Sequence, residues 1–84
     1  MFLFETILFY KGTPSYYKVH QQDTGYFFEA IPIAYYKHIT FPNIYLSQTD
    51  NELHATSCDN QELVEQAIED IQKFSYLHKV PATA

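Results

Sequence analysis

The chain has 84 residues, a length that suits one domain spanning residues 1–84. Hydrophobic residues make up 46% of it, as in a folded globular protein, and seven Phe and eight Tyr supply much of the packing area. The net charge is −5, and every cationic residue is a Lys. This balance argues against duplex nucleic acid and anionic membranes as partners, because both select clustered positive charge.

The cysteine content and the first residues indicate the expected cellular location of the protein. Cys58 is the only cysteine, so no internal disulfide can form and a disulfide-stapled secreted domain is not expected. The apolar start is interrupted by Glu5 and Thr6 and has no basic segment before it, which is a poor match to a secretion signal. We expect a soluble, cytoplasmic protein.

The first predicted element is a strand over residues 2–10. Its apolar residues fall on both faces, a pattern typical of a strand at the centre of a sheet. The segment Lys11-Gly12-Thr13-Pro14 follows it and has the composition of a turn.

The hairpin predicted over residues 15–31 has two possible registers. In one, Gly25 is the left-handed residue of a three-residue loop with a bulge, which leaves Glu29 opposite Val19. In the other, a two-residue loop places Lys18 opposite Glu29, which the charges favour. We favour the bulge, because a cross-strand pair contributes only about 0.2 to 1 kcal/mol.

Residues 33–41 form a further predicted strand, and a second hairpin follows it. Asp50-Asn51 suits a two-residue turn, because both residue types tolerate left-handed backbone angles. Pairing around this turn places Leu46 opposite Ala55. It puts the apolar residues of the hairpin on one face: Ile44, Leu46, Leu53 and Ala55.

A helix is predicted over residues 59–79, followed by a short tail over residues 80–84. Asp59 is the expected N-cap, and Glu62 is placed three residues later, as a capping box requires. Pro81 is expected to end the helix.

The predicted helix has one apolar stripe at spacings of three and four residues: Leu63, Val64, Ala67, Ile68, Ile71, Phe74 and Leu77. Cys58 and Leu63 occupy the two positions of a hydrophobic staple if Asp59 is the cap. We expect Ile68 and Ile71, at the centre of the stripe, to be buried against the sheet.

Together these elements predict an α+β fold. An antiparallel, meander-like sheet of five or six strands occupies residues 2–58, and one C-terminal helix packs on one face of it. A strongly curled sheet, or a small barrel capped by the helix, is the alternative.

The sheet face away from the helix is the predicted functional surface. Strand alternation assigns to it tyrosine, histidine and lysine side chains: Tyr16, Lys18, His20, Tyr36, His38, Tyr45 and His54. Aromatic rings with hydrogen-bonding ends are typical of binding surfaces. A face exposed only to solvent and a face that joins two copies are the alternatives.

Two short patterns contain residue types that catalytic sites use. Asp23-Thr24-Gly25 resembles the active-site triplet of aspartic proteases, but polar Gln21-Gln22 precedes it, and a turn is favoured. His54 and Cys58 are four residues apart along a strand, about 13 Å, too far for a catalytic pair or a shared zinc ion. No metal is expected, because the histidines show no metal-ligand spacing and there is no second cysteine. No cofactor is expected either, and the chain's two glycines cannot build a phosphate-binding loop.

These observations predict a non-enzymatic binding or protein-interaction module that uses this face with another protein or with a second copy. The alternative is a small enzyme with an acid/base pocket between two copies. In that case His20 or His38 would be the acid/base, and a tyrosine would be the donor. The sequence identifies no particular small-molecule ligand.

Overall fold

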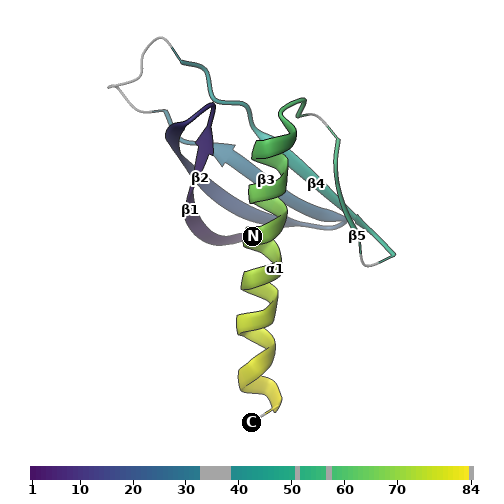
Figure 1. Ribbon diagram of the computed structural model, residues 1–84. Helices are drawn as coiled ribbons and strands as arrows, with labels where there is room; N and C mark the ends of the chain where they lie inside the picture. Colours follow the sequence, from purple (N-terminus) through teal and green to yellow (C-terminus); the bar gives the residue numbers. More distant parts are fainter. Residues whose placement is uncertain (33–38, 51, 57, 84) are drawn as a thin grey trace.

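The computed structural model describes residues 1–32, 39–50, 52–56 and 58–83. One sheet contains the five strands: β1 (Phe2–Tyr10), β2 (Thr13–Gln22), β3 (Gly25–Ala30), β4 (Ile44–Thr49) and β5 (Glu52–Ala55). Neighbouring strands pair antiparallel in chain order, and helix α1 (Gln61–Thr83) packs on one face (Figure 1). The predicted α+β meander is confirmed, and this sheet is not closed into a barrel.

The strand predicted over residues 33–41 falls mostly on residues outside the described ranges. Its last residues, 39–41, are not part of a strand. Phe41 is nevertheless nearly buried, and its ring centroid is 5.9 Å from that of Tyr10, so this connection packs against the first hairpin.

The prediction that residues 2–10 form a central strand was wrong. The strand exists with the predicted bounds, but β1 is at the edge of the described sheet. Apolar residues occur on both of its faces for two separate reasons. Leu8 is buried under α1, whereas Ile7 and Phe9 point to the opposite side and are about half exposed.

The favoured register of the first hairpin was also wrong. Lys18 pairs with Glu29 and Val19 pairs with Phe28, so the loop has two residues, Asp23 and Thr24. Burial explains the outcome, because a one-residue slip moves every side chain to the other face. The observed register buries Phe28, whereas the bulged register would turn Glu29 inward.

Gly25 has a different role from the one predicted. Its backbone is not left-handed, and it starts β3 directly opposite Ser47 of β4. A side chain at this position would collide with the carbonyl oxygen of Leu46. Glycine is therefore needed because two strands approach closely, and not because of the turn.

The second hairpin confirms its prediction. Leu46 pairs with Ala55 and Gln48 pairs with Leu53. Asp50 has a φ angle of 51°, the left-handed conformation expected at this turn.

The start of α1 differs by one residue from the prediction. Asn60 is the N-cap, since its side-chain oxygen accepts a 2.9 Å hydrogen bond from the Leu63 backbone N–H. The predicted capping box with Asp59 and Glu62 therefore does not form, and Cys58 is one position too early for a staple. Asn and Asp are equally good caps, so the burial of Leu63 in the core decides between them.

The apolar stripe of α1 is confirmed only over its first part. Leu63, Val64, Ala67 and Ile71 are buried, Ile68 is partly buried, and Leu77 is 63% exposed. Figure 1 shows why, because the C-terminal half of α1 runs past the sheet. The helix continues to Thr83, beyond the predicted end before Pro81.

The core lies between α1 and the inner face of the sheet. Its buried side chains come from every strand except β5: Leu8, Ser15, Tyr17, Val19, Phe28, Ile44 and Leu46. Buried polar atoms are paired, since Ser15 Oγ donates to the Leu8 carbonyl at 2.6 Å and Tyr17 Oη donates to the Pro42 carbonyl at 2.8 Å. Such pairing avoids the cost of a buried, unsatisfied polar group.

Truncation of Ile71 should test how α1 docks. Ile71 is 2% exposed, so Ile71→Ala should lower the free energy of unfolding by about 2 to 5 kcal/mol. Tyr76→Ala, on the exposed side of the same helix, is the control and should change it by less than about 0.5 kcal/mol. Urea denaturation followed by circular dichroism measures both, and equal stability of the two variants would contradict the docking.

Tyr17 should make stability sensitive to alkaline pH. Burial raises the pKa of its hydroxyl from 10.0 to about 12. The resulting stabilisation is complete below pH 10 and is lost as the pH rises through about 12, so the free energy of unfolding should fall across this interval.

Tyr17→Phe removes this ionisation and should show a shallower fall over the same interval, measured by urea denaturation at several pH values. Tyr16→Phe, on the exposed face of the same strand, is the matched control and should follow the parent protein. Parallel curves for the parent and Tyr17→Phe would show that the buried hydroxyl is not the group responsible.

Candidate functional site

The face of the sheet opposite α1, called the outer face here, has a row of aromatic rings across four strands. The row consists of Phe2 on β1, His20 on β2, Phe27 on β3 and Tyr45 on β4, and each ring is the register partner of the next. Neighbouring ring centroids are 6.0, 6.0 and 4.4 Å apart. We call this set the aromatic row, and its contacts hold the rings in place across the face.

A charged row runs beside the aromatic row. Lys18 on β2 pairs in register with Glu5 on β1 and with Glu29 on β3, so one cation is placed between two carboxylates. Glu29 also approaches the aromatic row, since its Oε1 is 3.2 Å from His20 Nε2. Opposite charges on neighbouring strands stabilise this register and give the centre of the face a defined charge pattern.

The β1 side of the outer face is apolar. Ile7 is 49% exposed, Phe9 is 51% exposed, and Tyr16, the register partner of Ile7, is 44% exposed. Phe2, at the end of the aromatic row, is similarly exposed. Exposed apolar side chains that gather on one face are common where a protein contacts other molecules.

The structure places most of the predicted site residues on this face. Tyr16, Lys18, His20 and Tyr45 project to the outer face, while Tyr17 and Val19 between them are buried in the core. Tyr36 and His38 lie outside the described residues.

His54 is separated from the other predicted residues. It pairs with Ser47 at the β5 edge, and its Nε2 is 3.4 Å from Glu52 Oε2. Both side chains of this pair are largely exposed. His54 therefore contacts its own strand neighbour and is not part of the aromatic row.

Sequence reasoning missed Phe2, Ile7, Phe9 and Phe27 as members of the outer face. The alternation of residues along β1 contained the signal for Ile7 and Phe9, but apolar residues on both faces also predict a central strand. Phe27 was missed because the bulged register assigned it to the core side.

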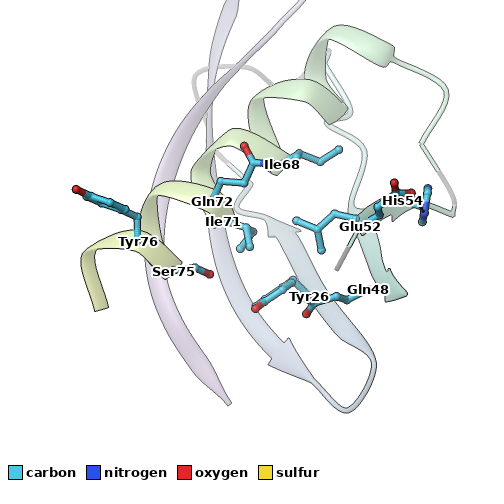
Figure 2. Close-up of a pocket in the computed structure, with 10 residues that line it drawn as sticks. Tyr26, Gln48, Glu52, His54, Ile68, Ile71, Gln72, Ser75 and Tyr76 are labelled. Carbon is cyan, nitrogen blue, oxygen red and sulfur yellow. Dashed lines mark ion pairs between the residues drawn. The ribbon is translucent and has the colours of Figure 1, made fainter. Parts of the chain in front are cut away.

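A groove between α1 and strands β3–β5 was also not predicted. It encloses about 500 Å³, and Leu53, Ile68 and Ile71 form its apolar part. Polar side chains line the rest: Tyr26, Gln48, Gln72 and Ser75. Figure 2 shows Ile71 and Tyr26 on opposite sides of the groove, with Glu52 and His54 together at its edge and Tyr76 directed away.

The described residues offer little for catalysis by a thiol or a metal. Cys58 is partly buried against the core, and its Sγ is 3.9 Å from the Asn60 carbonyl, so it packs at the start of α1. Within the described part of the chain, no three His, Cys, Asp or Glu side chains gather closely enough to hold a metal ion.

Comparison of the chain with protein-family models, with curated proteins and with solved structures gives no match. Over its described residues, α1 has no stretch long and apolar enough to cross a bilayer.

Proposed function

We propose that the protein is a non-enzymatic protein-interaction module whose contact surface is the outer face. The observation on which this rests is the aromatic row, continued by the exposed Ile7, Phe9 and Tyr16 on the same face. Large aromatic side chains supply most of the binding energy in protein interfaces, because they bury much area and lose little conformational entropy.

The arrangement of charges supports specific recognition. Glu5, Lys18 and Glu29 form a line beside the aromatic row, so a partner must present apolar groups and complementary charges at a fixed separation. Charges at such a contact orient the partner and reject others. The rings are held by their neighbours before binding, which lowers the cost of ordering them.

An enzyme is less well supported. His20 and Glu29 form an imidazole–carboxylate pair of the kind that acid/base catalysis uses. Glu29 is half exposed on an open sheet face, where bulk water competes for both groups. A catalytic pair works best where water is excluded, so binding accounts better for this geometry.

The proposal predicts that binding depends on the outer face and not on the helix. In the double variant with Tyr16→Ser and Tyr45→Ser, two exposed rings are removed while the core is unchanged. Loss of one anchoring ring costs about tenfold or more in affinity. Immobilised parent protein and variants are compared for the proteins that they retain from native cell extract, using quantitative mass spectrometry.

Tyr76→Ser on α1 is the matched control, because it removes a ring that is even more exposed. Partners retained by the parent and by Tyr76→Ser should be depleted with the double variant, and circular dichroism should show that all three proteins are folded. Equal retention by the parent and the double variant would exclude the outer face as the contact surface.

A further inference from the structure

The two edges of the sheet differ in how well they are protected. β5 has four residues and presents Glu52 and His54. β1 has nine residues, with Glu5 as its one charged side chain and no proline. Exposed edge strands in natural proteins are usually short, charged or interrupted by proline, because an open edge pairs with other strands. Of these three protections, the β1 edge has only the single charge of Glu5.

Among the described contacts, the helix bonds to the backbone of the β1 edge at one residue only. Gln66 acts like a short piece of strand at Phe9: its Oε1 accepts a 2.8 Å bond from the Phe9 N–H, and its Nε2 donates a 2.8 Å bond to the Phe9 carbonyl. The other contacts of α1 with β1 reach its inner face, since Thr6 Oγ1 donates to Asp70 Oδ2 at 2.6 Å and Phe4 stacks on Phe74.

The bonds at Phe9 show which backbone groups face the edge. In an antiparallel strand, the N–H and C=O of alternate residues point to the same side. Phe9 points to the edge, so Ile7 and Glu5 do so as well, while Thr6 and Leu8 point to β2. Glu5 and Ile7 thus each offer a backbone donor and a backbone acceptor at the edge, and the side chain of Ile7 is exposed beside them.

We propose that this edge pairs antiparallel with β1 of a second copy, with the twofold axis at Thr6. The two sheets then become continuous, and Glu5 of each copy lies opposite Ile7 of the other. This inference concerns the edge of the sheet and stands whether or not the outer face binds a further protein.

The register follows from exclusion of the neighbouring ones. An axis at Glu5 would set the two Glu5 carboxylates directly opposite each other, which is unfavourable. An axis at Ile7 would set Glu5 opposite Phe9, whose backbone groups are already bonded to Gln66. With the axis at Thr6, Glu5 and Ile7 exchange hydrogen bonds in both directions, and the Gln66 bonds are kept.

The ends of the pairing are also defined. With the axis at Thr6, Phe9 faces Leu3 of the second copy. The β1–β2 register shifts between Phe2 and Phe4, so Leu3 lies in a bulge, and bulges bend a strand and end its pairing. The contact is thereby limited to the central residues of β1. A second copy fits this edge because the same donors, acceptors and side chains recur across the axis.

The test is the molar mass of the full chain, measured by light scattering up to about 1 mM protein in salt sufficient to screen the net charge. The parent should approach twice the mass of one chain. Ile7→Pro should be monomeric, because it removes an N–H that faces the edge while the bonds from β1 to β2 are kept. Ile7→Lys, which places a charge at the edge without changing the backbone, should also be monomeric.

Tyr45→Lys is the control, since Tyr45 is similarly exposed on the outer face but lies on β4. It should keep the dimer mass. A parent protein that stays monomeric at every concentration would overturn the proposal. So would a dimer that survives Ile7→Pro but is lost in Tyr45→Lys, because that pattern would show pairing through the outer face. Neither result depends on the retention of partners from extract, so the two proposals can fail separately.

Discussion

The packing of Phe28 against Tyr17 and Val19 determines the rest of this structure. All three side chains are fully buried, and the rings of Tyr17 and Phe28 meet edge to face with centroids 6.3 Å apart. Because side chains alternate along a strand, burial of these three sends their neighbours to the opposite face. A slip of one residue between β2 and β3 would expose Phe28 and bury Glu29, at a cost that the turn cannot offset.

The outer face is the consequence of that packing. With Tyr17 and Val19 inside, Tyr16, Lys18 and His20 must point outward, and the register with β3 then brings Phe27 beside His20. Strand β2 therefore supplies side chains to the core and to the middle of the proposed contact surface. A small domain buries a limited share of its surface, so rings that lie outside its core are available for contacts with other molecules.

The sequence predicts this fold where local and long-range preferences agree. The β4–β5 hairpin was predicted in its observed register, because the turn residues and the apolar alternation both place Leu46 opposite Ala55. The helix and its buried stripe up to Ile71 were predicted for the same reason. The cap was misplaced by one residue, because Asp59 and Asn60 are chemically equivalent there and packing selects between them.

The errors arise where one residue pattern has more than one physical cause. From the sequence, Gly25 suits a bulged loop. In the structure it permits the close approach of β4, a strand that is distant from Gly25 along the chain. The two-sided apolar pattern of β1 suits a central strand and equally suits an edge strand with an exposed apolar face. The groove beside α1 depends on how the helix crosses the sheet, which no local pattern specifies.

The register of β2 with β3 can be measured directly by nuclear Overhauser effects between α-protons. Val19 and Phe28 face each other as a pair that exchanges no backbone hydrogen bonds, since the neighbouring even-numbered residues of β2 bond to β3. The Cα atoms of such pairs are about 4.5 Å apart, which brings their α-protons into close contact. The account predicts a strong cross-peak between the α-protons of Val19 and Phe28. A strong cross-peak from the α-proton of Val19 to that of Glu29, the close pair of the bulged register, would contradict it.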